Sequence, residues 1–392
     1  MSKVVEKRLR DIGCNFISGF GFKSSDYTDT GIPLIKIGNI QNRIVTVDKN
    51  GTFIPENIIN EKIKQFFLSN NDVLIAMTGQ GSVGRVGRLK LYNNKRALLN
   101  QRVGKFLCDE ETINIDYLYY ILTSDRYQEY LFNTGAGSGQ PNLSPELILQ
   151  TEIPWCEYNL QKAIAEVLSS FDDKIDLLHR QNATLEKMAK ILFRQWFVME
   201  LNEDWESRSL SSIADFLNGL ACQKFPPKNE IEKLPVLKIK ELSNGITENS
   251  DWASTDVKPE YIVENGDVIF AWSASLMVRI WDGQNCILNQ HLFKVTSNDY
   301  PKWFYYLWCM HHLAEFIAKA ASHATTMGHI KRGDLDEAMV LVPSEDELEE
   351  MTFKAEPLID KIIANNRQIK LLINLRDTLL PKLMSGEVTV IE

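Results

Sequence analysis

Asn71-Asp72-Val73-Leu74-Ile75-Ala76 is the stretch that decides the fold, because it returns later in the chain as Gly266-Asp267-Val268-Ile269-Phe270-Ala271. Other stretches return in the same order: Pro33–Ile37 as Pro235–Ile239, Leu99-Asn100-Gln101 as Leu288-Asn289-Gln290, Asp173-Lys174-Ile175 as Asp360-Lys361-Ile362, and the spaced Leu9, Ile12, Phe16 and Gly19 as Leu210, Ile213, Phe216 and Gly219. The offset falls from 201 residues between Leu9 and Leu210 to 187 between Asp173 and Asp360. A period this long predicts a duplicated domain with loops of unequal length, not a short-period solenoid.

The composition is that of an ordinary globular protein. Of the 392 residues, 44% are hydrophobic and 24% are charged, and the length suffices for two or three domains with their own cores. We expect no membrane span, because no run of about 18 apolar residues occurs, and no signal peptide. The six cysteines form no C-x-x-C pair, which favours reduced thiols in the cytoplasm over disulfides or a zinc site.

The charge is acidic overall but basic locally. The net charge is −9, which by itself argues against a polyanionic partner. However, the window from Gln80 to Leu107 contains no Asp or Glu and carries Arg85, Arg88, Lys90, Lys95, Arg96, Arg102 and Lys105. Such a window is a candidate phosphate-facing surface, and the alternative is a solvated loop.

Each half of the chain has the same predicted order of elements. Short strand-like runs with Gly, Asn and Pro turns come first, then a helix (residues 117–132 or 301–321), a loop (134–141 or 322–331), and a long helix. We therefore place domain limits near residues 155, 200 and 343.

The two long helices carry heptad repeats. Ile164, Phe171, Leu178, Leu185 and Leu192 recur every seven residues in the first helix, and each helix has one Asn in its apolar seam, Asn182 and Asn365. An antiparallel pair with these Asn residues opposite each other also sets Leu178 against Ile369, Leu185 against Ile362 and Leu168 against Leu379. A buried Asn fixes register at some cost in stability. The alternative is that each helix packs on a partner protein, with the Asn residues exposed.

Three further expectations concern the second long helix. In the predicted register Phe171 faces Arg376, whose charged head should bend out to solvent. Ser344-x-x-Glu347 is typical of a capping box. Because proline breaks a helix interior, the uninterrupted helix should begin at Pro357.

Several motifs mimic catalytic or cofactor sites without their required context. Gly79-Gln80-Gly81-Ser82-Val83-Gly84 fits G-x-G-x-x-G, but the residues after it alternate like a strand, whereas a dinucleotide site needs a helix there. Phe225-Pro226-Pro227 lacks the Asp or Asn of an amino-methyltransferase motif, and the histidines show no metal spacing. The sequence therefore predicts no enzyme activity, no cofactor and no metal on this chain.

The repeated segments resemble a known family, the specificity (S) subunits of type I restriction–modification enzymes. The resemblance rests on Leu9…Gly19, Gly38-Asn39-Ile40, Asp72–Ile75, Leu99-Asn100-Gln101, Gly135…Pro141, Trp272-Ser273, Ile280-Trp281, Asn289-Gln290-His291, Leu192–Phe197 and the C-terminal run Leu375–Glu387. It covers nearly the full chain. One departure is the glycine-poor loop from Ser322 to Ile330.

The resemblance implies an α+β fold with duplicated, pseudo-twofold halves, in which two similar target-recognition domains are separated by a pair of long antiparallel coiled-coil helices. The expected domains are 1–155 and 201–343 for recognition, with 156–200 and 344–392 as helical spacers. It further implies that each recognition domain reads one half of a bipartite site in double-stranded DNA. The helices would bind two modification (methyltransferase) subunits and possibly two restriction (translocase/nuclease) subunits, and S-adenosylmethionine, ATP and Mg²⁺ would belong to those partners.

Polar side chains on predicted turns are the candidate DNA contacts. Asn and Gln can pair with adenine, and Arg and Lys with guanine. In the first domain the candidate base readers are Lys36, Asn39, Gln41, Arg43, Gln80, Ser82, Arg85, Gln140 and Asn142; in the second they are Lys238, Lys240, Asn244, Ser273, Ser275, Arg279, Thr325, Thr326 and His329. The candidate phosphate contacts are Arg88, Lys90, Lys95, Arg96, Lys331 and Arg332.

The length of the first long helix suggests a ruler. The 25 residues from Phe171 to Trp196 span about 38 Å at ~1.5 Å per residue, close to the ~34 Å of one DNA turn. Two half-sites read from one face would then leave a gap of roughly 5–8 bp. The competing hypotheses are a coiled-coil adaptor whose two domains bind proteins and a standalone nuclease or methylase.

Overall fold

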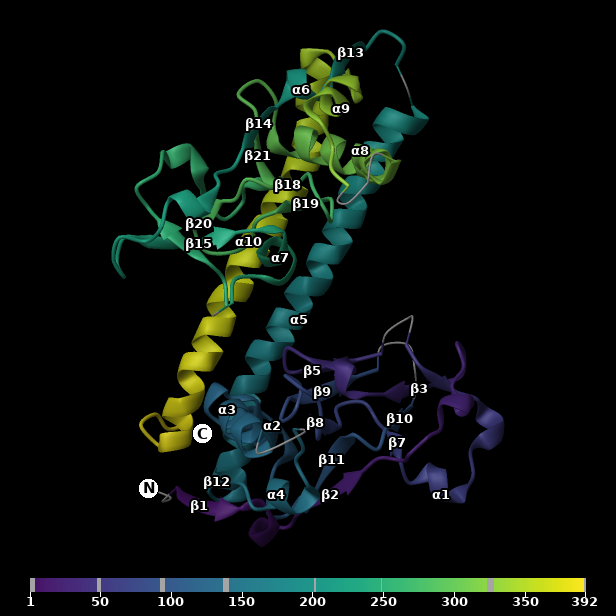
Figure 1. The fold of residues 1–392 in the computed structure, drawn as a ribbon, viewed down its shortest axis with the longest axis vertical. Helices are drawn as coiled ribbons and strands as arrows, with labels where there is room; N and C mark the ends of the chain where they lie inside the picture. The colour runs from purple at the N-terminus through teal and green to yellow at the C-terminus, as the bar shows by residue number, and fades with distance from the viewer. Residues whose placement is uncertain are drawn as a thin grey trace. The chain divides into compact units, whose positions relative to one another are not determined.

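The computed structural model describes residues 4–47, 51–91, 96–136, 141–200, 202–247, 249–322 and 328–390. They form two compact units: unit 1 comprises Met1–Lys174 with Leu372–Glu392, and unit 2 comprises Ile175–Leu371. Both borders fall inside long helices, α5 (Tyr158–Arg194) and α10 (Glu345–Ser385), so each unit contains one segment of each helix (Figure 1). The mixture of helices and sheets is α+β, as predicted.

The sheets of unit 1 are described first. A six-stranded sheet has the order β2 (Cys14–Ser18), β11 (Val103–Cys108), β8 (Val73–Ala76), β9 (Val86–Lys90), β5 (Ile44–Thr46), β4 (Ile40–Gln41). A four-stranded sheet has the order β6 (Phe53–Ile54), β3 (Ile32–Ile35), β10 (Ala97–Leu99), β7 (Phe67–Leu68). A third sheet pairs β1 (Val5–Arg8) with β12 (Glu152–Trp155). The helices are α1 (Glu61–Lys64), α2 (Ile115–Thr123), α3 (Asp125–Gly135) and α4 (Pro145–Leu149).

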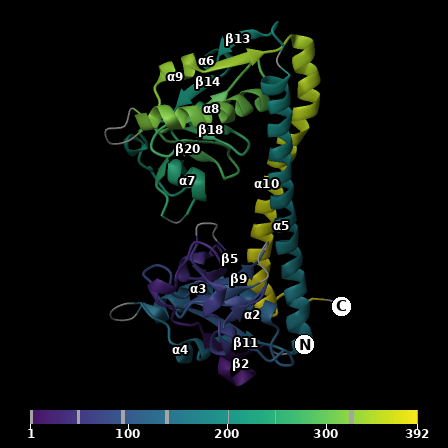
Figure 2. The same cartoon turned by 90° about the vertical axis from the view of Figure 1, so that its right-hand side faces the viewer.

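Unit 2 repeats this plan with fewer strands. One sheet has the order β14 (Asp215–Asn218), β21 (Leu292–Thr296), β18 (Val268–Ala271), β19 (Met277–Ile280), and another has the order β16 (Trp252–Ser254), β15 (Lys233–Leu237), β20 (Cys286–Leu288), β17 (Ile262–Val263). The third pairs β13 (Glu206–Ser209) with β22 (Met339–Val342). The helices are α6 (Leu210–Ile213), α7 (Ile239–Asn244), α8 (Lys302–Ser322) and α9 (Arg332–Glu337), and α8 packs along the sheet that contains β18 (Figure 2).

The repeated stretch forms the centre of each sheet. Every residue of β8 and of β18 is buried, as expected of apolar runs inside a sheet. The acidic residue before each strand makes the same ion pair, Asp72 with Lys105 and Asp267 with Lys294, each at 2.8 Å from Nζ to Oδ2. The predicted duplication is therefore confirmed down to individual contacts.

A second shared contact explains the repeated glycine and the repeated Leu-Asn-Gln. Gly19 and Gly219 lie directly against the turn after β10 and β20, where an added Cβ would come within 2.2 Å of the Leu99 oxygen or 2.3 Å of the Asn289 oxygen. The next residues, Phe20 and Leu220, make parallel bridges to Asn100 and Asn289. This close backbone approach admits only glycine, and it holds the two sheets of each unit together.

The units differ in two elements. Where unit 1 continues after β3 into the 3₁₀ turn Ile37–Asn39 (η3) and the β4–β5 hairpin, unit 2 continues after β15 into α7. The helix expected at 117–132 is two helices, α2 and α3, because Ser124 adopts an extended backbone with ψ 151°. Its counterpart α8 is unbroken.

Within unit 2, the segments of α5 and α10 pair in the predicted antiparallel register. Asn365 Nδ2 donates to Asn182 Oδ1 at 2.9 Å, and Asn182 Nδ2 donates to Asn366 Oδ1 at 2.6 Å. Both predicted Asn residues are buried, so the amides satisfy each other inside the apolar seam. The chain after α5 makes one π-helical turn, Gln195–Met199, which turns both Trp196 and Phe197 into the unit 2 core.

Within unit 1, the same register holds but one detail of the prediction is wrong. Leu168, Leu380 and Leu383 share the unit 1 core. Arg376, however, does not bend out to solvent: its side chain is only 13% exposed, and it donates to Asp172 Oδ1 at 2.5 Å and to Asp377 Oδ1 at 3.0 Å. Two carboxylates therefore hold the charge at the helix seam, which the heptad pattern alone could not show.

The start of α10 confirms one expectation and corrects another. Glu347 N donates to Ser344 Oγ at 3.4 Å, and Ser344 N donates to Glu347 Oε2 at 3.1 Å, which is the predicted capping box. The helix runs without a break from Glu345 through Pro357, so the expected start at Pro357 is wrong. Proline removes the hydrogen bond to the carbonyl of Phe353, but that residue is 83% exposed, and water can satisfy the carbonyl there.

Candidate nucleic-acid interface

In unit 1, several predicted reader segments come together at the ends of β8 and β10. The glycine turn after β8 lies against η3, since a Cβ on Gly79 would be 2.9 Å from Ile37 Cδ1. Met77 N donates to Arg102 O at 2.9 Å, and Thr78 bridges to Asn142. The glycine turn, the turn after β10 and the segment around Asn142 therefore form one surface.

The exposed side chains on this surface suit base recognition. They are Gln80, Arg85, Gln101, Arg102 and Asn142, which we call the first reader cluster. Amide side chains can donate and accept at once, as adenine requires, and guanidinium groups donate in pairs, as guanine requires. The cluster carries two positive charges and no carboxylate, which also suits a phosphate-rich partner.

Unit 2 builds the equivalent surface from different side chains. Trp272 N donates to His291 O at 3.4 Å, as Met77 does to Arg102, and Ser273 bridges to His329, as Thr78 does to Asn142. The residues at this surface that we call the second reader cluster are Asn218, Ser275, Gln290, His291 and His329. All except the half-buried Gln290 are exposed. Neutral histidine offers one donor and one acceptor, so this cluster has a chemistry that the first lacks.

Sequence reasoning missed four members of these clusters. Gln101, Arg102, Gln290 and His291 were not chosen as base readers, although each pair lies at the end of the repeated Leu-Asn-Gln stretch. That repeat was itself the available signal, because the residues that close a shared structural turn are presented at the same place in both units. Ser273, which was chosen, is buried and instead has its Oγ 3.1 Å from His291 Nδ1.

Three predicted arginine contacts have structural partners. The Arg88 side chain is only 11% exposed, forms a 2.7 Å ion pair with Asp116, and stacks 4.1 Å above the Tyr119 ring. Arg43 pairs with Asp377 at 2.6 Å. Arg279 Nη1 donates to the carbonyl oxygens of Leu242 and Ser243 at the end of α7. We therefore omit these three from the reader clusters.

The predicted readers before the glycine turn lie in ordered polar contacts. Lys36 Nζ donates to Thr52 Oγ1 at 2.7 Å, and burial lowers the pKa of this lysine. Asn39 Nδ2 donates to Thr46 O at 3.0 Å, and Gln41 Nε2 donates to Gly38 O at 3.0 Å. Ser82 is half-buried in the glycine turn. In unit 2, Lys238 is ion-paired with Asp251, whereas Lys240 and Asn244 are exposed on α7.

The predicted phosphate contacts are scattered. Arg96 Nη2 lies 2.8 Å from both carboxylate oxygens of Glu56, and Lys90 ends β9. Lys331 and Arg332 are exposed at the start of α9. The predicted contacts Lys95, Gln140, Thr325 and Thr326 lie outside the described residues.

Two searches bear on other kinds of site. Among the residues that the structure describes, no group of three or more His, Cys, Asp or Glu side chains could hold a metal ion. Within the same residues, no helix is both long and apolar enough to cross a membrane.

Comparison with known proteins identifies the family. A family model described as "Type I restriction modification DNA specificity domain" matches residues 1–187 and again residues 202–375. The chain belongs to this family of type I restriction–modification specificity subunits. Each match contains one reader cluster, so the family's domain occurs twice, as the repeats predicted.

Relatives of similar length support the assignment. The type I restriction enzyme MjaIX specificity subunit of Methanocaldococcus jannaschii is 27% identical over 418 aligned residues, covering 98% of this chain and 94% of the relative. The putative MjaX specificity subunit of the same organism is 22% identical and covers 92% and 88%. The S subunit of a type I restriction–modification system from M. genitalium has the same fold, with a TM-score of 0.57 at 16% identity over 97% of this chain and 96% of that one.

The resemblance inferred from the sequence is thus confirmed. Specificity subunits are the noncatalytic parts of type I restriction–modification complexes, so chemistry is not the role of this chain. What the site must provide is selective contact.

Proposed function

We propose that this specificity subunit reads a bipartite target in double-stranded DNA, with one half-site for each recognition domain. Residues 1–155 and 201–343 carry recognition in this proposal, and residues 156–200 and 344–392 form the helical spacers. The observation that carries it is the pair of reader clusters, which occupy equivalent positions on duplicated sheets and differ in side-chain chemistry. Equivalent placement suits the same task, and different side chains suit different bases.

The difference is sharpest at one position. Arg102 in unit 1 and His291 in unit 2 both follow the repeated Leu-Asn-Gln stretch and both accept a backbone hydrogen bond from the end of the central strand. Arginine favours the paired acceptors of guanine, whereas histidine has no such fork of donors. The two half-sites should therefore differ in sequence, and the first should require a guanine at the base that Arg102 contacts.

The same proposal assigns chemistry to partner subunits. Two modification subunits would bind the helical spacers and supply the methyl transfer with S-adenosylmethionine. Restriction subunits, where they take part, would supply ATP- and Mg²⁺-dependent translocation and cleavage. The residues on this chain would orient those subunits on a chosen site and hold no cofactor themselves.

The experiment is single-molecule sequencing of methylated adenine in cells with and without the gene for this chain. We expect the loss of one split motif, two short blocks with a gap of roughly 5–8 bp. Arg102→Ala should then relax or abolish one block, and His291→Ala the other, while Lys228→Ala, at an exposed ion pair with Asp256, serves as the control. An unchanged methylation pattern on deletion of the gene would contradict the proposal.

A further inference from the structure

The β4–β5 hairpin of unit 1 has a turn that holds an arginine in an unfavourable backbone conformation. Asn42 and Arg43, the two turn residues, have φ values of 51° and 66°. Such a turn needs positive φ at both positions, which Asn tolerates and which a long side chain rarely adopts. Something in the surrounding structure must therefore hold Arg43 in place.

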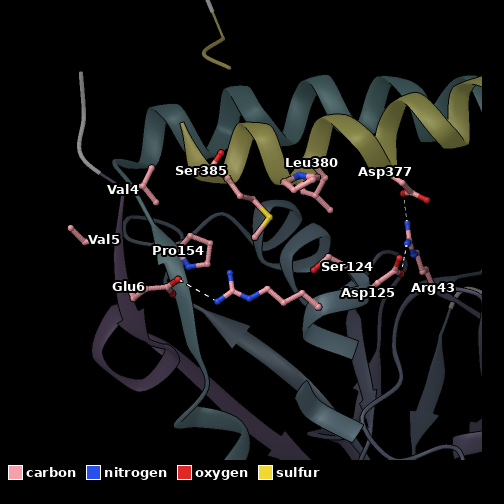
Figure 3. Close-up of a pocket in the computed structure, with 13 residues that line it drawn as sticks. Val4, Val5, Glu6, Arg43, Ser124, Asp125, Pro154, Asp377, Leu380 and Ser385 are labelled. Atoms are coloured by element: carbon pink, nitrogen blue, oxygen red, sulfur yellow. Dashed lines mark hydrogen bonds and ion pairs between the residues drawn. The ribbon is translucent and has the colours of Figure 1, made fainter. Parts of the chain in front are cut away.

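Arg43 is held at both its backbone and its side chain. Its guanidinium Nη1 donates to Asp377 Oδ1 at 2.6 Å, and Nη2 lies 3.4 Å from Asp125 Oδ1. Its carbonyl oxygen accepts from the Tyr119 hydroxyl at 3.1 Å. Figure 3 shows the Arg43 side chain between Asp377 of α10 and Asp125, at one end of a pocket of about 470 Å³ that Leu380 and Pro154 also line.

The contact with Asp377 continues into both long helices. Asp377 also accepts from Arg376, which donates to Asp172 of α5, and Asp172 accepts from the Tyr120 hydroxyl at 2.7 Å. Burial alone would raise the pKa of Asp377, but the hydrogen bonds from Arg376 and Arg43 outweigh it and hold that pKa below its usual range. The hairpin is thus tied to a charged network, and not to a single surface carboxylate.

On its other side, the hairpin determines where the reader segment Lys36–Gln41 lies. Asn39 Nδ2 donates to Thr46 O of β5, and Lys36 N donates to Asn39 Oδ1 at 2.8 Å. The same segment contacts the glycine turn through Ile37 and Gly79. A shift of the hairpin would therefore move both of these segments relative to the bases they face.

We propose that Arg43 is a positioning residue: through Asp377 of α10 it fixes the β4–β5 hairpin, and so sets which bases the first recognition domain accepts. This inference rests on the proposed function. It replaces the expectation from sequence that Arg43 reads a base itself. Unit 2 has α7 at this point in the chain and no counterpart of the hairpin, so the effect belongs to one half-site only.

The test compares Arg43→Ala, Asp377→Asn and the double variant in the full chain expressed with its modification subunit. The readout is methylation at duplexes in which either the first or the second half-site is altered. We expect each single variant to lower discrimination at the first half-site by about 10- to 100-fold, with the second unchanged. The double variant should be no worse than the more severe single variant, because both substitutions break one contact.

Controls separate positioning from direct reading. Arg43→Lys keeps a charge near Asp377 and should recover part of the discrimination, and Asp125→Ala should have little effect, because that carboxylate is 99% exposed. If Arg43→Ala relaxes the first half-site while Asp377→Asn does not, Arg43 contacts a base and the inference is wrong. It is also wrong if neither variant alters the first half-site.

The design also separates this inference from the proposed function. Asp377→Asn preserves shape and leaves unit 2 untouched, so methylation that depends on the second half-site reports whether the complex still assembles. Should the unaltered chain direct no split methylation motif at all, it is the proposed function that fails.

Discussion

The chain follows β3 with a hairpin and β15 with a helix, on two sheets that otherwise share strand order and anchoring contacts. The hairpin is secured by an arginine that reaches out of it to α10, whereas α7 is secured by Arg279, which reaches in from β19 to the carbonyl oxygens at its end. Cations suit the carbonyl end of a helix, and carboxylates suit an outgoing arginine. A duplicated frame can therefore carry unlike recognition elements, provided each brings its own attachment.

The largest expected effect tests the shared frame. Gly19→Ala and Gly219→Ala should each lower the free energy of unfolding of their own unit by roughly 3 kcal/mol, because the added Cβ meets a backbone oxygen that cannot move cheaply. Hydrogen exchange of β10 and β20 would measure the two effects separately. Gly38→Ala and Gly333→Ala are the controls, since nothing lies within 4 Å of the Cβ positions there. Unequal losses would mean that the two anchors are not equivalent.

The duplicated ion pairs should show a smaller effect with a difference between units. Lys105→Met leaves Asp72 buried without its cation, at a cost of roughly 2 kcal/mol, below that of a fully buried pair. Lys294→Met should cost more, because Lys294 Nζ also donates to Ile262 O at 2.9 Å. Urea unfolding would measure both. Lys228→Met, at an exposed pair, should change stability by less than about 0.5 kcal/mol.

The attachment of α7 should contribute less again. Arg279→Ala should cost roughly 1 kcal/mol, since it removes hydrogen bonds from an exposed guanidinium to two carbonyl groups. Exchange of the α7 amides would rise while that of the β4–β5 hairpin stayed constant. If α7 exchange were unchanged and the second half-site were instead relaxed, Arg279 would be a base reader, as the sequence suggested.

The smallest expected effect concerns pH, and only unit 1 should show it. The pKa of Asp377 is depressed in the folded chain, so its contribution to stability is present above the ordinary Asp value of about 3.9 and is lost as the pH falls through the folded pKa. The difference in urea midpoint between the unaltered chain and Asp377→Asn should therefore be constant near pH 7 and shrink below about pH 4. The Asn182–Asn365 contact in unit 2 has no group that titrates there. A difference that persists to pH 2 would contradict this account.

The sequence predicted what long patterns determine. Seven-residue spacing with one Asn in each seam gave the register of α5 and α10, because an amide is satisfied in an apolar seam only opposite another amide. The repeats gave the duplicated sheets, since Asp72 and Gly19 return with the residues they contact.

The sequence could not predict features that depend on remote partners or on very short segments. Arg88 looked like a solvent-facing cation, and only the packing of α2 supplies Asp116 and Tyr119 around it. The hairpin and α7 are too short to show a period, so nothing in the sequence distinguished them. Arg376 fell on an apolar line whose neutralising carboxylate, Asp172, lies in the other long helix.

Unit 1 is discontinuous in sequence, and this affects the order in which the molecule can be completed during synthesis. Its core includes Leu380, Leu383 and Met384, and its hairpin depends on Asp377, all of which leave the ribosome after every residue of unit 2. The first recognition domain to be translated is therefore the last to finish folding, although domains usually fold in the order of their synthesis. A nascent chain stalled after Leu371 would hold a finished second domain and a first domain still waiting for its final helix.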